Sequence, residues 1–401
     1  MKEKDTYMNQ IPTNRPTDPR SPRPKYQGRP IRLPKKCAPP KALVISTTLT
    51  AILLVLSIMT LSIALLVGTP GRASSDNGTG KKNGREQQNQ QVINNKIPSS
   101  LHLSGMTNAR GKQSYSFGNV AQISTESQAA ALIDVTNGRA VAGKNGDERV
   151  YPASMTKVMT LLVAVEKATD PSALLTVTEA MVQKYKSSYN PGELGPSIAI
   201  EWKAGDQVTV ETALYLVIYE SDTYACWLLA EHIAGSEAAF VQMMNDRAAS
   251  LGLSGTTHFE NCTGLYHDNH YTTCFDMSII MAAAMTNSAA KTVLMSTDLY
   301  SFDVYTNGVA TSSASVWSGW YTGRLEKYRY GAAAAYYAGN GSDIRLIAGK
   351  TGYETIPKYC FVTAGENDQT GTLFVCVQVG GASAKDSTDD TREIYQEFAT
   401  Y

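Results

Sequence analysis

The stretch KYCFVTAGENDQTGTLFVCVQVGG, residues 358–381, contains two apolar runs separated by a short polar segment. Valine, phenylalanine and cysteine recur in both runs, whereas the intervening NDQTG is made of residues that favour turns. This pattern predicts a β-hairpin centred near Asp368. The C-terminal end of the chain is therefore expected to supply two antiparallel strands of a sheet.

A second hairpin pattern lies near the start of the globular part of the chain. AALIDV (130–135) and RAVAG (139–143) are apolar runs on either side of the turn signal TNG. Between the two hairpins, an apolar segment at 155–168 predicts a buried helix, and helical patterns continue to about Asn287. A closing helix is expected at 391–401. Strands at both ends with helices between them predict an α+β domain whose sheet joins distant parts of the chain.

Three segments precede this domain, which is expected to span residues 120–401. Residues 1–41 are rich in proline and basic side chains, and predict a disordered cytoplasmic tail. Residues 42–69 carry no charge and are long enough to cross a bilayer core of about 30 Å, which favours a transmembrane helix over the shorter apolar part of a cleavable signal peptide. Residues 70–119 predict a flexible polar linker. The basic arm before the span places the N-terminus in the cytoplasm and the domain outside.

The charge of the chain gives no indication of nucleic-acid binding. There are 36 basic and 36 acidic residues, but residues 1–41 hold eleven of the basic ones and only Glu3, Asp5 and Asp18 of the acidic ones. This leaves 25 basic and 33 acidic residues downstream, so the remainder is mildly acidic and lacks a nucleic-acid signature.

The segment YPASMTKVMT (151–160) places a serine and a lysine three positions apart. On a helix, Ser154 and Lys157 share one face, and a neutral lysine amine can take the proton of a serine hydroxyl. The lysine can act only if its pKa is lowered, because an ammonium group has no lone pair to accept a proton. The pattern alone is weak evidence, since Ser288 and Lys291 also match it.

Two further motifs follow in an informative order. Ser221, Asp222 and Thr223 stand before an amphipathic helix, and Lys350-Thr351-Gly352 stands at the beginning of a strand pattern. A lysine and a hydroxyl at a strand edge can hold a carboxylate, and glycine allows close approach of a backbone. Acyl-serine enzymes with Ser-x-x-Lys, a Ser-x-Asn-like triplet and Lys-Thr-Gly have their motifs in this order.

The chain from about residue 120 resembles the serine D-alanyl-D-alanine carboxypeptidases, the low-molecular-mass penicillin-binding proteins. The similarity extends beyond the motifs to LAEHIAGS (229–236), to the segment 240–278 and to AGKTGYETIPKYCFVTAGE (348–366), all in the family's order. The resemblance implies a β-lactamase and transpeptidase type of fold, with a central antiparallel sheet and helices on both faces. It implies no cofactor and no metal.

The resemblance also assigns roles to individual residues. Ser154 would be the acylated nucleophile, Lys157 its general base, and Ser221 a proton relay. The remaining positions would bind substrate: Lys350, Thr351 and Gly352 of the Lys-Thr-Gly motif, Thr223, Tyr353 and Arg392. Of these, Tyr353 would share an oxyanion hole with the Ser154 backbone N–H, and Arg392 would lie near the terminal carboxylate.

Thr223 departs from the family, which usually has asparagine there. Threonine offers one hydroxyl where asparagine offers an amide donor and a separate carbonyl acceptor. A contact with Lys157 can survive this change, while the contact with the substrate backbone weakens. We therefore expect activity that is reduced or retuned, since one such contact is worth about 1 to 3 kcal/mol.

Cysteines and histidines offer two further interpretations. Those in CTGLYHDNHYTTC are Cys262, His267, His270 and Cys274. They predict either a zinc site or a disulfide between the two cysteines, and an exported domain favours the disulfide. Cys360 and Cys376 can pair across the C-terminal hairpin or lie unpaired in the core.

Together these observations predict an enzyme anchored in the membrane that removes the terminal D-alanine of peptidoglycan stem pentapeptides. β-Lactams mimic the D-Ala-D-Ala amide and should acylate Ser154. A β-lactamase is an alternative, but no Glu-x-x-Leu-Asn segment lies between Ser221 and Lys350. The other alternative is a non-catalytic cell-wall binding or sensing module, suggested by Thr223.

Overall fold

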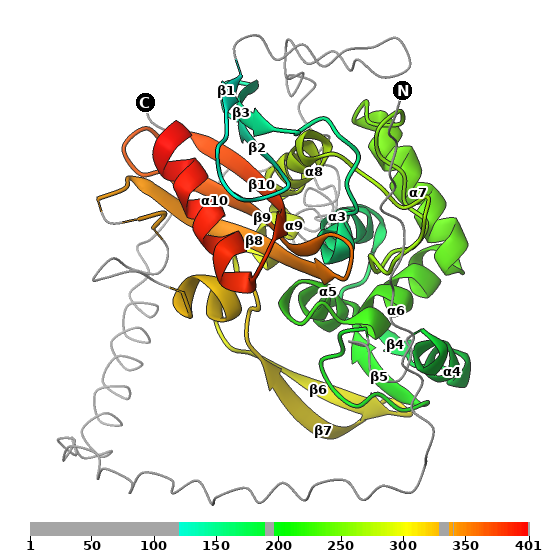
Figure 1. Ribbon diagram of the computed structural model, residues 1–401. Helices are drawn as coiled ribbons and strands as arrows, with labels where there is room; N and C mark the ends of the chain where they lie inside the picture. The colour runs from blue at the N-terminus through cyan, green and yellow to red at the C-terminus, as the bar shows by residue number, and fades with distance from the viewer. Residues whose placement is uncertain (1–119, 189–195, 329–336, 340, 400–401) are drawn as a thin grey trace, which may run out of the picture. The chain divides into compact units, whose positions relative to one another are not determined.

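The computed structural model describes residues 120–188, 196–328, 337–339 and 341–399 (Figure 1). Its helices and strands, in chain order, are β1 (Ala121–Gln122), β2 (Ala129–Asp134), β3 (Arg139–Lys144), η1 (Ala153–Thr156), α3 (Lys157–Lys167), β4 (Leu174–Thr176), α4 (Glu179–Ser187), β5 (Asp206–Thr209), α5 (Val210–Tyr219), α6 (Thr223–Ala234), α7 (Glu237–Ser250), α8 (Cys274–Thr286), α9 (Ser288–Met295), β6 (Tyr300–Thr306), β7 (Val309–Val316), η2 (Tyr321–Glu326), β8 (Ile344–Glu354), β9 (Lys358–Asn367), β10 (Leu373–Gly381) and α10 (Ala384–Phe398).

The segments predicted as tail, membrane span and linker, at 1–41, 42–69 and 70–119, lie outside the described residues. Within the described ranges, no helix combines the length and the apolar character needed to cross a membrane.

A six-stranded sheet has the order β1-β3-β2-β10-β9-β8. Both predicted hairpins are confirmed, as β2 with β3 and as β9 with β10. The early and late parts of the described domain meet where β10 pairs antiparallel with β2, Val377 opposite Ala131. The sheet is antiparallel apart from the short β1, which runs parallel to β3. Strand β8, which carries Lys350, lies at one edge.

Both faces of this sheet are buried, and successive residues of its strands enter two different cores. On β10, Val375 and Val377 belong to the core shared with α3 and α8, whereas Phe374 and Cys376 belong to the core shared with α10. Figure 1 shows α10 lying across one face of the sheet. Helices on both faces of a mainly antiparallel sheet confirm the predicted α+β architecture.

Helix α3 lies at the centre of the helical part of the domain. Nine of its eleven residues are buried, and it contacts α5, α6, α7, α8 and α9. The predicted helix at 155–168 is thus present, but it begins at Lys157 after the 3-10 turn η1. A helix packed on all sides gives the residues of its first turn fixed positions.

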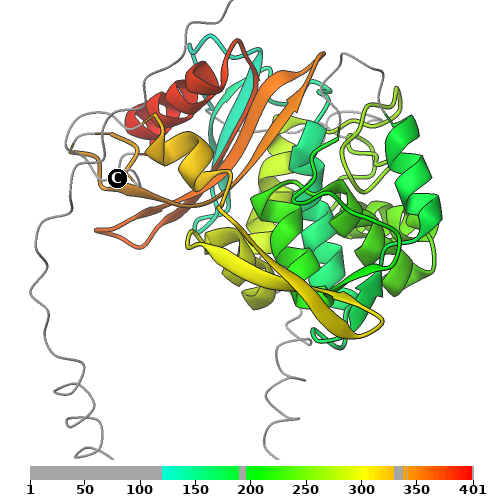
Figure 2. The same ribbon diagram turned by 90° about the horizontal axis from the view of Figure 1, so that it is seen from below.

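A second sheet, with the order β4-β5-β6-β7, was not predicted from the sequence. Figure 2 shows the β6–β7 hairpin extending from the six-stranded sheet along the helices. Strands β4 and β5 have only three and four residues, and β7 (VATSSASV) is largely exposed and has no apolar alternation. Its pairing with β6, rather than its composition, makes β7 a strand.

Two predicted boundaries are corrected. The closing helix begins at Ala384 rather than 391, because the Ser383 side chain accepts a hydrogen bond from the Asp386 N–H at 3.1 Å and caps it. Lys350 lies near the end of β8 rather than at its beginning, since the strand starts at Ile344.

Candidate active site

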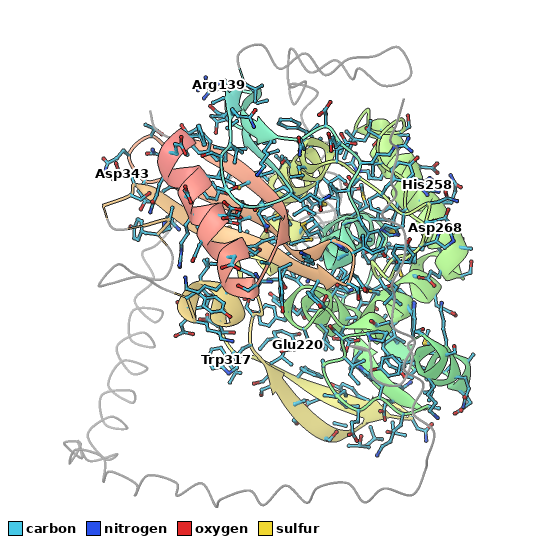
Figure 3. The ribbon with its side chains drawn as sticks, viewed as in Figure 1. Arg139, Glu220, His258, Asp268, Trp317 and Asp343 are labelled. Atoms are coloured by element: carbon cyan, nitrogen blue, oxygen red, sulfur yellow. The ribbon has the colours of Figure 1, made fainter. Side chains whose placement is uncertain are left out.

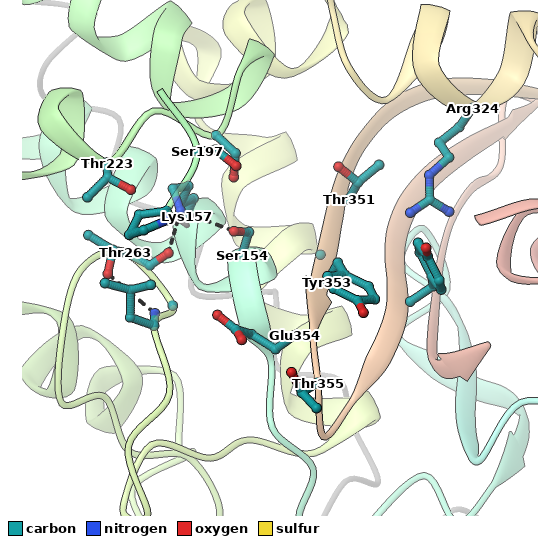
Figure 4. Close-up of a pocket in the computed structure, with 16 residues that line it drawn as sticks. Ser154, Lys157, Ser197, Thr223, Thr263, Arg324, Thr351, Tyr353, Glu354 and Thr355 are labelled. Atoms are coloured by element: carbon teal, nitrogen blue, oxygen red, sulfur yellow. Dashed lines mark hydrogen bonds between the residues drawn. The ribbon is translucent and has the colours of Figure 1, made fainter. Parts of the chain in front are cut away.

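A cleft of about 620 Å³ opens where β8 faces the helical part of the domain. The described residues that line it are Ser154, Lys157, Pro196, Ser197, Ser221, Thr223, Thr263, Gly264, Leu265, Arg324, Thr351, Gly352, Tyr353, Glu354, Thr355 and Tyr359. Three motifs separated by some two hundred positions of sequence therefore meet around one space. Figure 4 shows Ser154, Lys157 and Thr223 on one side of it, and Thr351 and Tyr353 on β8 on the other.

Ser154 and Lys157 are in hydrogen-bond contact. The Lys157 Nζ donates to Ser154 Oγ at 3.1 Å, and it also donates to the Thr263 backbone carbonyl (Figure 4). Lys157 is 2% exposed, so its amine is shielded from water and is held in place by these two hydrogen bonds. A lysine held in this way is placed to exchange a proton with the serine hydroxyl.

The turn before Ser154 has an unusual backbone. Ala153 has a φ of 46°, in the left-handed region that residues other than glycine seldom occupy. Gly264, with a φ of 80°, packs against this turn so closely that a Cβ there would lie 2.1 Å from the Ala153 carbonyl oxygen. The segment 262–266 therefore packs against the turn that carries Ser154. Only glycine at position 264 allows its backbone to come this close to Ala153.

A second lysine and serine pair stands across the cleft. Lys350 Nζ donates to Ser221 Oγ at 3.1 Å and to the Thr351 carbonyl at 2.7 Å. Ser221 has a φ of 59°, so its hydroxyl is also presented from a left-handed turn. Lys350 is 1% exposed and lies behind the cleft wall formed by Thr351.

Asp222 anchors the loop that carries Ser221. Its buried carboxylate accepts hydrogen bonds from the N–H groups of Ala225 (2.7 Å) and Ala199 (2.5 Å) and from the Trp202 indole (2.9 Å). The first of these bonds caps α6. Burial raises the pKa of Asp222, and the three donors oppose that shift. Asp222 thus joins the start of α6 to the loop at 196–202, which forms another part of the cleft wall.

Thr223 lines the cleft, and its backbone N–H donates to the Ser197 carbonyl at 2.9 Å. Within the described part of the chain, the partners of the Lys157 amine are Ser154 and Thr263, and the Thr223 hydroxyl is not among them. The sequence suggested a hydrogen bond between Lys157 and Thr223, and in the structure Lys157 makes this bond to the Thr263 carbonyl instead.

Both lysines lie where an ammonium group is poorly solvated. Burial lowers the pKa of Lys157 below its usual 10.5. Burial also lowers the pKa of Lys350, and the positive charges of Lys157 and Arg324 lower it further. Burial and the nearby Asp222 raise the pKa of Glu220, and Lys350 opposes this shift. Figure 3 shows Glu220 near the base of the β6–β7 hairpin. The site therefore favours the neutral, proton-accepting form of its lysines.

The end of β8 lies directly against the nucleophile turn. A Cβ added to Gly352 would lie 3.3 Å from Ser154 N, from Ala153 Cβ and from the Pro152 carbonyl oxygen. This contact brings the backbone on either side of Gly352 close to the Ser154 N–H. Because β8 is an edge strand, its outer backbone groups are available to an extended peptide.

Arg392, which was expected near the terminal carboxylate of the substrate, is not among the described residues that line the cleft. Arg392 is 5% exposed on α10 and donates to the backbone carbonyls of Leu325 (3.1 Å) and Tyr328. The arginine that lines the cleft is Arg324 on η2, which donates to the Ala384 carbonyl at 2.9 Å. Arg392 thus supports the turn that carries Arg324. No short motif surrounds Arg324 in the sequence, so only its position in space identifies it.

The predicted disulfide between Cys262 and Cys274 is absent, whereas the alternative that Cys360 and Cys376 lie unpaired in the core is confirmed. Cys262, Cys274, Cys360 and Cys376 are all free and buried. Cys360 and Cys376 cannot face each other, because they belong to the cores on opposite faces of the sheet. The Cys262 Sγ instead lies 3.2 Å from a carboxylate oxygen of Glu237.

His270 has a structural position beside the nucleophile helix. Its Nε2 lies 2.9 Å from Thr156 Oγ1, and its Nδ1 accepts from the Glu260 N–H at 3.3 Å. Burial lowers the pKa of His270 to about 3, so the ring is neutral. Among the residues that the structure describes, no three His, Cys, Asp or Glu side chains lie close enough together to hold a metal ion.

Comparison with known proteins identifies the family of this fold and site. The sequence model for D-alanyl-D-alanine carboxypeptidase matches residues 117–379. The D-alanyl-D-alanine carboxypeptidase DacF of Bacillus subtilis is 36% identical over 160 residues, which are 40% of this chain and 39% of that protein. DacA of Escherichia coli is 30% identical over 240 residues, 59% of this chain and 58% of that protein. The chain thus spans about two fifths to three fifths of the length of these relatives.

Solved structures agree on the fold. A Streptomyces DD-transpeptidase superposes with a TM-score of 0.58 at 23% identity, covering 69% of this chain and 98% of that one. Penicillin-binding protein 5 of Haemophilus influenzae superposes with a TM-score of 0.54 at 23% identity, covering 68% and 70%. Because the family model matches well over half of the sequence, this chain belongs to the D-alanyl-D-alanine carboxypeptidase family.

Proposed function

We propose that the protein is a serine D-Ala-D-Ala carboxypeptidase that removes the terminal D-alanine of peptidoglycan stem pentapeptides and is acylated by penicillin. The observation that carries this proposal is the 3.1 Å contact of the buried Lys157 amine with Ser154 Oγ, in a cleft that is also lined by Ser221, the hydrogen-bond partner of Lys350. Membership of the family supports the same reaction.

The reaction begins at Ser154. The neutral Lys157 amine takes the Ser154 proton as Oγ attacks the carbonyl carbon between the two D-alanines. The carbonyl oxygen becomes negatively charged and receives hydrogen bonds from the backbone N–H groups of Ser154 and Tyr353. As the carbon–nitrogen bond breaks, Ser221, hydrogen-bonded to Lys350, gives its hydroxyl proton to the leaving D-alanine amine and takes up the proton held by Lys157, which returns the lysine to its neutral form. Water then hydrolyses the ester on Ser154 and restores the free serine.

The terminal carboxylate binds at the basic end of the cleft. Arg324 supplies positive charge there, and Thr351 supplies a hydroxyl. The buried Arg324 guanidinium is fixed by its bond to Ala384 and by the rings of Tyr359 and Phe361, whose centroids lie 5.7 and 5.5 Å away. Arg324 takes the carboxylate-binding role that the sequence assigned to Arg392.

The proposal is tested by the release of D-alanine from N-acetyl-Lys-D-Ala-D-Ala. Full-length protein in detergent should release one D-alanine per peptide and become covalently labelled by fluorescent penicillin. Failure of both reactions would leave a cell-wall binding module without catalysis, and rapid multiple turnover of nitrocefin would make the protein a β-lactamase instead.

Thr223→Asn is expected to raise carboxypeptidase activity by roughly tenfold. Asparagine has nearly the volume of threonine, so it fits the buried position, and its amide adds a donor and an acceptor for the substrate backbone. The measurement is kcat/KM for D-alanine release, with Thr223→Val as the variant that removes the hydroxyl and adds no amide. An unchanged or lower rate in Thr223→Asn would mean that the site is built around threonine.

We also propose that residues 42–69 cross the cell membrane once, with the N-terminus in the cytoplasm and the catalytic domain outside. The uncharged length of this segment and the basic residues before it support this topology. Alkaline phosphatase fused after residue 119 should be active in intact cells, and the full chain should stay in the membrane fraction after alkaline extraction. A soluble chain after extraction would exclude the anchor.

A further inference from the structure

The cleft carries opposite charges on two sides of the strand β8. Arg324 lies on one side, and Glu354, the last residue of β8, lines the same cleft on the other. Figure 4 shows the Glu354 carboxylate turned toward Ser154 and Thr263, away from Arg324. Neither the sequence motifs nor the proposed reaction uses this carboxylate.

The strand fixes the position of Glu354. It pairs with Lys358 across the tight turn between β8 and β9. The rings of the preceding pair, Tyr353 and Tyr359, are in contact, with centroids 4.6 Å apart and planes tilted by 47°. Side chains alternate along a strand, so Glu354 and Tyr353 point to different sides of β8. The carboxylate is half-buried at the cleft wall, where its charge is less screened than on an open surface.

The negative charge of Glu354 affects the pKa values of two residues near Ser154, Lys157 and Tyr151. It opposes the burial effect that lowers the pKa of Lys157, and it adds to the burial effect that raises the pKa of Tyr151. Tyr151 donates its hydroxyl to the Gly264 carbonyl at 3.1 Å, under the nucleophile turn. Lys358, the cross-strand neighbour of Glu354, is an exposed cation.

The direction of the bound peptide relates this carboxylate to the substrate. If the terminal carboxylate lies beside Arg324 and the reacting carbonyl beside Tyr353, the chain upstream of the reacting bond runs antiparallel to β8 toward its last residue. Each residue of an extended peptide advances about 3.4 Å. The residue immediately before the two D-alanines therefore arrives beside Glu354.

We infer that Glu354 forms a subsite for a primary ammonium group carried by the peptide residue that precedes the two D-alanines. This inference rests on the proposed carboxypeptidase function and names the class of peptide that the enzyme prefers. In such a substrate the terminal carboxylate would contact Arg324, and the upstream ammonium would contact Glu354. Neutralising the amine removes one of these two charge contacts and leaves the reacting atoms unchanged.

The experiment compares two peptides on the full-length protein in detergent: N-acetyl-Lys-D-Ala-D-Ala with a free ε-amine, and the same peptide acetylated on that amine. The wild type is expected to have about a tenfold higher kcat/KM for the free amine, mainly through a lower KM. Glu354→Gln should bring this ratio close to one, because it removes the contact that only the free-amine peptide makes. Any effect of the lost charge on Lys157 changes the rates with both peptides and with fluorescent penicillin alike, so it cancels in the ratio.

Glu326→Gln is the matched control, since it removes an exposed carboxylate from the neighbouring turn η2 without altering the cleft lining. It should keep the wild-type ratio. Equal kcat/KM for the two peptides in the wild type, or an equal loss for both in Glu354→Gln, would overturn the subsite while leaving the carboxypeptidase function in place. No cleavage of either peptide and no penicillin labelling would remove both proposals.

Discussion

Replacing Ser154 by alanine is expected to lower D-alanine release on the order of a millionfold and to abolish covalent labelling by fluorescent penicillin. The substitution removes the atom that forms the acyl-enzyme. Any remaining rate would come from peptide binding and from the backbone donors that face the reacting carbonyl. Release is measured by coupled oxidation of D-alanine, and labelling by in-gel fluorescence.

The chain contains its own control for this variant. Ser288 and Lys291 match the same Ser-x-x-Lys pattern, but they begin α9, where Lys291 is exposed, and neither lines the cleft. Ser288→Ala should therefore keep full activity and labelling. Retention of more than about one hundredth of the wild-type release in Ser154→Ala would show that another group is the nucleophile.

Lys157→Met is expected to slow both D-alanine release and penicillin acylation by about 10²- to 10⁴-fold. Methionine keeps most of the length of the side chain and fills the same buried space, but it cannot accept the Ser154 proton. Rates of acylation are measured under single-turnover conditions. The exposed Lys291→Met serves as the control, and wild-type rates in Lys157→Met would exclude the amine as the base.

The same substitution is expected to stabilise the fold at neutral pH. Burial lowers the pKa of Lys157 in the folded protein below the 10.5 of the unfolded chain. Between these two values the unfolded chain binds the extra proton, so the free energy of unfolding of the wild type rises with pH in that window. At pH 7, which lies below the pKa of 10.5 in the unfolded chain, burial of this amine still lowers the free energy of unfolding, and methionine removes that cost. Urea denaturation at pH 7 should therefore give a higher midpoint for Lys157→Met.

The activity of the wild type should follow the same titration. As the pH falls through the folded pKa of Lys157, the amine takes up a proton and can no longer act as the base, so the acylation rate declines. This acid limb should lie below pH 10.5 and should be absent in Lys157→Met. A limb at the same pH in both proteins would assign the titration to another group.

Elements with a strong local pattern were predictable from the sequence. The hairpins β2–β3 and β9–β10 have apolar runs on both sides of turn residues, and α3 is apolar nearly throughout, because each of them is buried. The β6–β7 hairpin lacks such a pattern. Ser301 pairs with Ser315 and Asp303 with Ser313 on an exposed face, where hydrogen bonds between strands stabilise the element with little burial.

The candidate site divides in the same way. Ser154, Lys157 and Ser221 were predictable because short motifs in a fixed order surround them. Arg324 and Thr263 were not, since one contributes a guanidinium from an irregular turn and the other only a backbone carbonyl. The position of Arg392 was not predictable, because the sequence of α10 does not show whether this side chain points into the cleft or toward the backbone of η2.

The sequence by itself determined the order of the motifs, the two terminal hairpins and the family to which they point, because these depend on spacing along the chain and on local burial. Only the tertiary structure decided which charges share the cleft. The Lys157 amine meets Thr263 from a distant loop, Arg324 replaces Arg392, and Glu354 faces the nucleophile. Such contacts depend on how β8, η2 and the helices pack, and no periodicity along the chain encodes the distance between side chains on different elements.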